Sequence, residues 1–130
     1  MKKLLALLVT TAVAASVYAA SPFADISVKD VNAAVAARSA VIIDVNGTKS
    51  YDAGHVPTAL NYESIKDNFA ASLPADKNAL IIAYCGNPKC GAYAKAAAAA
   101  RKLGYTNIRH MSAGIAGWKD AGMKVETASQ

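Results

Sequence analysis

The chain has 130 residues and a formal net charge of +5, with its basic residues scattered along the sequence. Because Lys and Arg form no cluster interleaved with aromatic residues, we expect no nucleic-acid partner. A mild positive excess suits small anions or acidic proteins without specifying either.

The first nineteen residues are typical of a secretory signal peptide. Lys2 and Lys3 form a short positive region, and the apolar stretch 4–15 follows. Residues 17–19, which end at Ala19, suit the recognition site of a signal peptidase. The apolar stretch is shorter than the roughly 20 residues of a membrane span. We therefore expect cleavage after Ala19 and a periplasmic or secreted protein with no membrane attachment. An uncleaved anchor is the weaker alternative.

Cleavage would leave residues 20–130 as a single domain. These 111 residues (130 − 19) suffice for one modest core and not for two. The length is typical of a monomer. The net charge of +5 includes Lys2 and Lys3, so the mature chain would carry +3 (5 − 2).

The mature sequence opens with helix and strand signals in alternation. Ser27–Asp30 resembles a capping box with Asp in place of Glu, and it opens a helix that continues to about Ala37. The β-branched run Val41–Val45 predicts a short buried parallel strand. Asn46-Gly47 breaks that strand, and residues 49–53 predict a short helical turn.

The alternation continues to the end of the chain. Residues 59–62 predict a weak strand and 65–71 a short helix, before the strongest strand at 79–84. The remaining elements are a helix over 91–103 that stops at Gly104, a strand over 107–111 and a helix over 115–121. This order predicts an open α/β fold with helices on both faces of a parallel sheet. In such folds ligands bind outside the carboxyl ends of the strands, where Asp44 and Cys85 both fall.

Cys85 is the candidate nucleophile. It lies between the strand 79–84 and a breaker-rich loop, 86–91, that leads into an alanine-rich helix. Backbone N–H groups and the positive end of the helix dipole favour thiolate over thiol at such a position, and the thiolate is the reactive species. The other cysteine, Cys90, lies in the same loop, so sulfur chemistry is the leading interpretation.

The two cysteines admit two interpretations. In an exported protein, a pair of cysteines indicates a disulfide. A bridge between Cys85 and Cys90 would close a very small ring and constrain the unfolded chain little. The spacing therefore favours a redox element over a structural bridge.

Four other side chains are candidates near the site. His55, in a Gly-His-Val-Pro turn, is interpreted as a hydrogen-bonded structural residue, and His110 as a strand-end residue with no assigned chemistry. The histidines have no paired ligand spacing, so we expect neither a metal nor a cofactor. Trp118 is expected to pack the last helix against the sheet or to wall the site. Asp44 is expected to hydrogen-bond loop amides or to cap its own strand.

Together, four segments of the mature chain resemble the rhodanese-like sulfurtransferase family. The resemblance covers essentially all of residues 20–130. The segments are Val41–Val45, Tyr51–Pro57 with Ala59 and Asn61, the Tyr84-Cys85 loop, and Gly114–Trp118 with Gly122. The resemblance implies a five-stranded parallel sheet and a cysteine that forms a persulfide, which matches Cys85. The histidine that matches His55 belongs to the fold signature of the family.

The resemblance also implies a mechanism. Cys85 would take sulfane sulfur from a small anion such as thiosulfate, or from a persulfide, and pass it to cyanide or to a thiol, including a protein thiol. The active loop would hold the anionic sulfur through backbone amides, with one glycine for the tight turn and a proline for stiffness. The loop residues are Gly86, Asn87, Pro88, Lys89, Cys90 and Gly91. Lys89 is the only cation among them, and it either attracts the donor or is a solvated surface lysine.

The sequence departs from the family pattern at three positions. Cys90 stands where many members have an arginine, which disfavours a phosphatase or arsenate reductase and resembles a variant with a C-x4-C loop. Asn46 replaces the arginine that commonly follows the Asp-Val pair, and Thr58 replaces the glycine that usually follows Pro57.

Three functional hypotheses remain at the level of the sequence. The first is an exported sulfurtransferase, in which Cys90 is either a resolving thiol that attacks a Cys85 persulfide or a small half-buried residue. The second is a non-catalytic persulfide carrier that needs a protein partner. The third is a thiol–disulfide redox protein that cycles between Cys85 and Cys90.

Overall fold

Five parallel strands form one sheet in the order β1-β5-β4-β2-β3, with β4 at its centre. The computed structural model describes residues 21–128, so the expected signal peptide lies outside the described part. All four strand pairings are parallel, and the predicted five-stranded sheet is confirmed. The strands are β1 (Ala24–Asp25), β2 (Ala40–Asp44), β3 (Leu60–Asn61), β4 (Leu80–Tyr84) and β5 (Ile108–His110).

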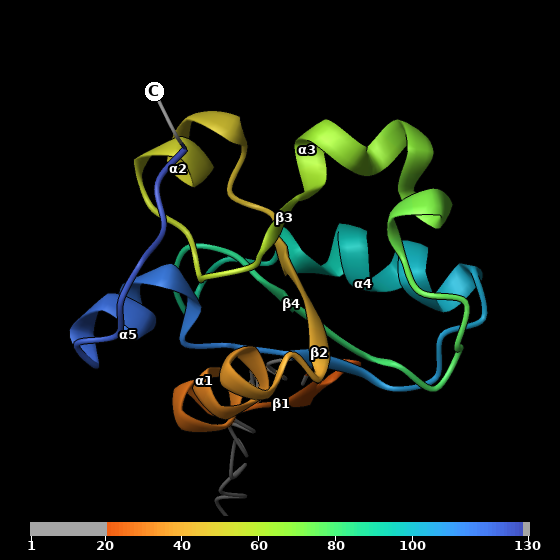
Figure 1. Cartoon of the computed structure of the whole chain (residues 1–130), viewed down its shortest axis with the longest axis horizontal. Coiled ribbons are helices and arrows are strands. Elements are labelled where there is room, and N and C mark those ends of the chain that lie inside the picture. The colour runs from red at the N-terminus through yellow and green to blue at the C-terminus, as the bar shows by residue number, and fades with distance from the viewer. Residues whose placement is uncertain (1–20, 129–130) are drawn as a thin grey trace, which may run out of the picture.

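Helices cover both faces of this sheet, as the alternating pattern predicts (Figure 1). The first face is covered by α3 (Tyr62–Ile65), the 3-10 helix η1 (Lys66–Ser72) and α4 (Tyr93–Lys102), and the second by α1 (Val28–Ala37) and α5 (Gly114–Asp120). A short helix, α2 (Thr48–Ala53), follows β2. Within residues 21–128, no helix has the length and hydropathy needed to cross a membrane.

The strands alternate their side chains between two cores. Ile81 and Ala83 of β4 pack under α4, while Ile82 and Tyr84 pack against α1 and α5. Neighbouring residues of a strand point to opposite faces, so a continuous apolar run serves a sheet that is covered on both sides. This is why the run before Cys85 shows no alternation between polar and apolar residues.

The predicted helix start at Ser27 is confirmed. The Ser27 hydroxyl accepts a hydrogen bond from the Asp30 N–H at 3.1 Å and donates one to the Asp30 carboxylate at 2.7 Å.

Two elements of the structure differ from the sequence prediction. The helix expected over 65–71 is replaced by α3, which ends at Ile65, and by η1, which has a kink at Asn68 with a φ of −132°. Strand β1, only two residues long, has no sequence pattern that predicts it.

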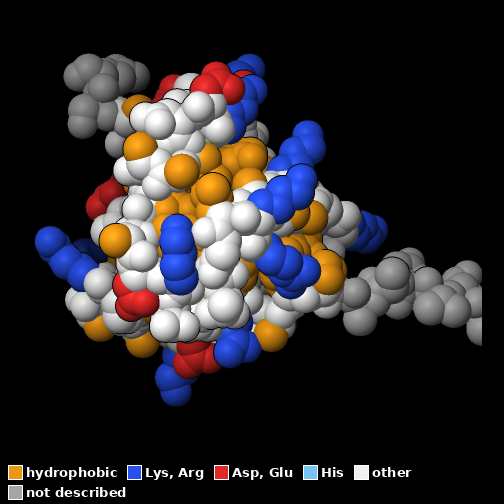
Figure 2. Space-filling model, turned by 90° about the vertical axis from the view of Figure 1, so that its right-hand side faces the viewer, with side chains coloured by type: hydrophobic (Ala, Val, Ile, Leu, Met, Phe, Trp, Pro, Cys, Tyr) orange, Lys and Arg blue, Asp and Glu red, His pale blue; other side chains and the backbone are white. Residues whose placement is uncertain are grey.

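Figure 2 shows the side of the molecule that carries η1 and the end of α4. Lys and Arg side chains are scattered around an apolar area on this face. The area includes a shallow hollow lined by η1 and α4, where Phe69, Lys66 and Lys102 lie. The basic side chains of this face do not form one continuous stripe, in keeping with their scatter along the sequence.

Candidate active site

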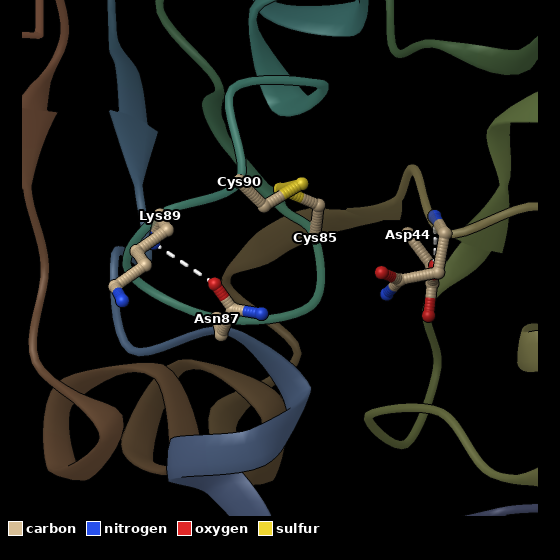
Figure 3. The surroundings of a disulfide bond; sticks show 6 residues. Asp44, Cys85, Asn87, Lys89 and Cys90 are labelled. Carbon is tan, nitrogen blue, oxygen red and sulfur yellow. Dashed lines mark hydrogen bonds between the residues drawn. A yellow bond between two sulfur atoms is a disulfide. The ribbon is translucent and has the colours of Figure 1, made fainter.

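Asp44 and Cys85 lie at the carboxyl edge of the sheet, as the sequence predicts. Strands β2 and β4 are neighbours with Asp44 paired to Tyr84, and Cys85 follows directly. The Asp44 side chain nevertheless turns away from the cysteine loop (Figure 3). Its carboxylate accepts a hydrogen bond from the Asn46 N–H at 2.7 Å and another from the Tyr84 hydroxyl at 2.5 Å. Of the two roles expected for Asp44, the structure shows the strand-end cap.

Tyr84 completes a buried polar chain that the sequence analysis missed. Its hydroxyl donates to Asp44 and accepts from the Val56 N–H at 3.0 Å. Burial, followed by the nearby Asp44 charge, strongly raises the pKa of Tyr84, so its hydroxyl stays protonated. The sequence did contain a hint of this contact, because Tyr84 and Asp44 lie at the ends of two predicted buried strands.

The cysteine loop is fixed by the start of α5. The Cys85 carbonyl accepts a hydrogen bond from the Ile115 N–H at 2.9 Å, and the Gly86 carbonyl accepts one from the Ala116 N–H at 3.0 Å. Two carbonyls of the loop thus face α5, and Gly114 packs directly against the Gly86 backbone. The predicted segment around Gly114 therefore acts by positioning the loop.

Inside the loop, Asn87 organises a tight turn. Its side-chain oxygen accepts a hydrogen bond from the Lys89 N–H at 2.9 Å (Figure 3), and its carbonyl accepts one from the Cys90 N–H at 3.0 Å. These two amides are therefore already in use. Among residues 21–128, the amides of Gly86 and Gly91 and that of Asn87 itself have no hydrogen-bond partner. They are the amides left to hold an anion.

Cys85 and Cys90 are joined by a disulfide, with their Cα atoms 6.2 Å apart. Only 1% of Cys85 is exposed, because it packs into the core under α4 with Tyr93 and Ala96. Cys90 is half-buried. In this oxidised form the expected nucleophile is covered, and the bond must be reduced before Cys85 can react.

The donor-side hollow, as we name it, has a volume of about 250 Å³ and lies between the end of β2, α3 and the start of α4. It abuts the cysteine loop, because a Cβ atom on Gly86 would lie 3.5 Å from the side-chain oxygen of Asn46. Its lining residues are Val45, Asn46, Gly47, Tyr62, Glu63, Lys66, Ala92 and Lys95. Neither cysteine lines it. Lys89 was expected either to attract the donor or to be a solvated surface lysine; it is exposed and points away from the disulfide (Figure 3).

His55 and Trp118 make structural contacts, and neither residue lines a hollow beside the cysteine loop. The His55 ring stacks on Tyr51 at 3.6 Å, and its Nδ1 lies 2.7 Å from the Tyr51 carbonyl oxygen. The Trp118 Nε1–H donates to the Lys124 carbonyl at 2.8 Å, and its ring packs into the core beneath α5. The backbone of His55 pairs in antiparallel fashion with Glu126, so the segment 124–126 contacts both His55 and Trp118.

His110, which had no assigned chemistry, lies beside the cysteine loop. It is 6% exposed, and its ring stacks on Tyr93 at 3.3 Å. Burial lowers the pKa of His110, and the nearby Asp25 carboxylate opposes that effect. The sequence could not reveal this proximity, because it arises from the pairing of β5 with β4. In the described part of the chain, no three His, Cys, Asp or Glu side chains come together to hold a metal ion.

Comparisons with known proteins agree on one family. The model of the rhodanese-like domain family matches residues 27–121. The structure is similar to the BH2092 protein of Bacillus halodurans, with 25% identity, a TM-score of 0.63, and coverage of 80% of this chain and 77% of that one. It is also similar to the rhodanese-like domain of the Anabaena sp. Alr3790 protein, with 21% identity, a TM-score of 0.64, and coverage of 79% and 78%.

A third similar structure is the thiosulfate sulfurtransferase of Pseudomonas aeruginosa, with 24% identity and a TM-score of 0.67. The alignment covers 80% of this chain but only 20% of that much longer protein. No curated protein matches the sequence significantly.

Proposed function

The chain belongs to the rhodanese-like domain family, and on that premise we propose that it is an exported sulfurtransferase. It moves sulfane sulfur from thiosulfate or a persulfide to a thiol or cyanide, through a persulfide on Cys85. The observation that carries the proposal is the place of Cys85, at the end of the central strand β4 and before the ten-residue helix α4. The amides of Gly86, Asn87 and Gly91 are free there to stabilise an anionic sulfur.

The first half-reaction loads the cysteine. The reduced Cys85 thiolate attacks the outer sulfur of thiosulfate, the sulfur–sulfur bond of the donor breaks, and sulfite leaves with the bonding electron pair. The new Cys85 persulfide carries a negative charge on its terminal sulfur. Because the loop amides are held in place by Asn87 and by α5, they stabilise this charge without rearranging.

The second half-reaction unloads it. Cyanide attacks the terminal sulfur, thiocyanate is released, and the Cys85 thiolate returns. A thiolate acceptor reacts in the same way and leaves as a persulfide. Where no acceptor arrives, Cys90 attacks the inner sulfur of the Cys85 persulfide, hydrosulfide leaves, and the Cys85–Cys90 disulfide forms. The disulfide of the structure supports this resolving role, since it places the two sulfur atoms within bonding reach.

The donor-side hollow supports an anionic donor. Lys66 and Lys95 line it, with Glu63 as the only acidic residue. The hydrogen bond from the Thr48 N–H lowers the pKa of the Glu63 carboxyl, so Glu63 stays negatively charged, and the two lysines leave the lining with a net positive charge. The Nδ2 of Asn46 is buried and, among residues 21–128, has no hydrogen-bond partner. A buried donor without an acceptor suits a ligand oxygen, such as one of thiosulfate.

The first experiment is the intact mass of the reduced protein, residues 20–130, before and after thiosulfate. Trypsin cleaves after Lys89 and so separates the two cysteines into different peptides. We expect one added sulfur atom on the Cys85 peptide, removable by cyanide with continued turnover, and hydrosulfide in solution wherever Cys90 has resolved the persulfide. Added sulfur without turnover would identify a persulfide carrier. No added sulfur and no released hydrosulfide, with a Cys85–Cys90 disulfide instead, would contradict the proposal.

The disulfide itself favours one second candidate function, a thiol–disulfide redox protein. In that case the bond forms and breaks reversibly in thiol buffers without any sulfur donor, and thiosulfate leaves no sulfur on Cys85. The same mass measurement, combined with an assay of released hydrosulfide, separates the two functions.

A further inference from the structure

A second, larger hollow lies beside the cysteine loop, where the ends of β1 and β5 meet the start of α4. We name it the Cys90 hollow; its volume is about 700 Å³. The lining residues that matter here are Asp25, Lys89, Cys90, Tyr93, His110 and Ser112. Cys85 does not line it, and no residue of the donor-side hollow does. Figure 3 shows Lys89 on the side of the loop toward β1 and β5, with Asp44 on the opposite side.

The two sulfur atoms of the disulfide are unequally accessible. Cys85 is 1% exposed inside the core under α4, whereas Cys90 is half-buried and lines the hollow. In thiol–disulfide exchange, the thiolate must reach the sulfur that it attacks, and access decides which sulfur reacts. A thiol that enters from solvent through this hollow therefore meets Cys90.

The floor of the Cys90 hollow is aromatic and rigid. The rings of Tyr93 and His110 stack at 3.3 Å, and the Tyr93 hydroxyl is 2.6 Å from the Ser21 hydroxyl oxygen. Both residues are largely buried and held by the fold, and the hollow that they line is mostly apolar. Such a surface suits the carbon chain of a small thiol.

The rim carries charges of both signs. Lys89 is exposed, and the exposed Asp25 is held in place because its carboxylate accepts a hydrogen bond from the Ser112 N–H at 2.9 Å. With one cation and one carboxylate at the rim, the hollow has no strong preference for a charged ligand of either sign. An uncharged thiol such as 2-mercaptoethanol is therefore a suitable probe.

We propose that the Cys90 hollow binds a small thiol and directs it to the Sγ atom of Cys90. The thiol loses its proton to solvent, and its sulfur forms a bond to Cys90 as the Cys85–Cys90 bond breaks. Cys85 leaves with the bonding electron pair, as a thiolate beside the free loop amides. A second thiol then attacks the outer sulfur of the mixed disulfide, which yields the Cys90 thiol and the external disulfide. The hollow is thus the reduction site that returns Cys85 in its reactive form.

The test uses the oxidised protein, residues 20–130, mixed with limiting 2-mercaptoethanol. The reaction is quenched in acid, free thiols are alkylated, and trypsin separates the cysteines after Lys89. We expect the mixed disulfide on the Cys90 peptide and the alkyl group on the Cys85 peptide. This product should be about tenfold more abundant than the reverse arrangement. The reverse arrangement, or an equal mixture, would overturn the proposal.

A filled hollow provides the second measurement. In Ser112→Trp the new ring occupies the hollow, and we expect the rate constant for reduction by 2-mercaptoethanol to fall by about tenfold. Ser50→Trp, at an exposed position on α2, is the matched control and should reduce at the wild-type rate. Equal rates in all three proteins would contradict a thiol site at this hollow. Should Ser112→Trp fail to fold, the wild-type mapping decides alone.

This inference goes beyond sulfur transfer, and its failure is separable from failure of the proposed function. No sulfur donor is present in either measurement, so the outcome does not depend on whether Cys85 accepts sulfane sulfur. A protein that loads sulfur on Cys85 but is reduced at Cys85 would keep the first proposal and lose the second.

Discussion

Gly114 is in backbone contact with Gly86. A Cβ atom on Gly114 would lie 2.6 Å from the Gly86 carbonyl carbon and 2.7 Å from the Asn87 amide nitrogen, and Gly114 has a φ of +65°. Both the space and the backbone conformation therefore require glycine. Since the next two amides bind the Cys85 and Gly86 carbonyls, α5 acts as the support that holds the cysteine loop in place.

Gly114→Ala should displace the loop amides and so lower sulfur transfer. A misplacement of about 1 Å at a reacting centre can cost on the order of 100-fold in rate. The measurement is kcat for thiosulfate and cyanide together with the free energy of unfolding. Gly122→Ala is the control, because Gly122 has a φ of +73° with no atom within 4 Å of a Cβ. It should lose about 1–2 kcal/mol of stability from the left-handed backbone alone and keep its activity. Equal activity losses in both variants would refute the support role.

Substitution of each cysteine in turn should distinguish the nucleophile from the resolving thiol. Cys90→Ser is expected to load sulfur on Cys85 and to form no intramolecular disulfide, whereas Cys85→Ser is expected to load none, because the nucleophile is gone. Peptide mapping after thiosulfate reads both outcomes. A Cys90→Ser protein that accepts no sulfur would show that Cys90 is needed in the loading step and would reject its assignment as a resolving thiol.

Lys95→Ala should weaken the binding of an anionic donor. Lys95 lines the donor-side hollow. An exposed charge contributes up to about 1 kcal/mol to the binding of an anion, or roughly twofold to fivefold in affinity. We expect KM for thiosulfate to rise by that factor at unchanged kcat, and the difference to shrink at high salt. Lys102→Ala, on the same helix but outside the hollow, is the control. A KM unaltered by the Lys95 change would place the donor elsewhere.

Thr58→Gly should stabilise the fold. Thr58 has a φ of +71°, a backbone conformation that is rare for a β-branched residue and that glycine adopts readily. We expect a gain of about 1 kcal/mol in the free energy of unfolding, reduced by the extra freedom of glycine in the unfolded chain. Arg38→Gly is the comparison, since Arg38 has a φ of +50° but no branch at Cβ, and its gain should be smaller.

His110 should make the fold sensitive to mild acid. Burial lowers its pKa in the folded state below 6.5, so as pH falls below about 6.5 the unfolded chain binds a proton that the folded chain refuses. Stability is then present above that pH and is lost as pH falls toward the folded-state pKa, by at most about 1.4 kcal/mol per pH unit. His110→Phe keeps a ring to stack on Tyr93 and should flatten this slope in urea titrations between about pH 5 and 7. An unchanged slope would assign the effect to other groups.

The sequence predicts the layers of the fold because the spacing of apolar residues and the residues that start or end an element are local properties of the chain. The run before Cys85 lacks alternation, which identifies a strand covered on both faces, and Ser27 identifies a helix start. The meeting of Asp44 and Cys85 at one edge follows from parallel strands. Strand β1 carries no such pattern, since two residues show no period.

The partners within the site are beyond the reach of local patterns. The bond from Tyr84 to Asp44 depends on the register of β2 against β4, and the place of His110 beside Cys90 depends on the order of β5 and β4. The sequence could state that Asp44 lies near the cysteine loop, but not that its carboxylate faces Tyr84 and Asn46.

The backbone pairing of His55 with Glu126 extends the folded domain beyond the residues that the family model matches. Two hydrogen bonds of 2.9 Å join the two residues, and the Lys124 carbonyl accepts the Trp118 indole N–H. The family match stops at residue 121. A protein trimmed to that boundary would lose these hydrogen bonds, which contribute about 0.5–1.5 kcal/mol each to the free energy of unfolding. Contacts that stabilise this domain therefore extend past the residues that the family model matches.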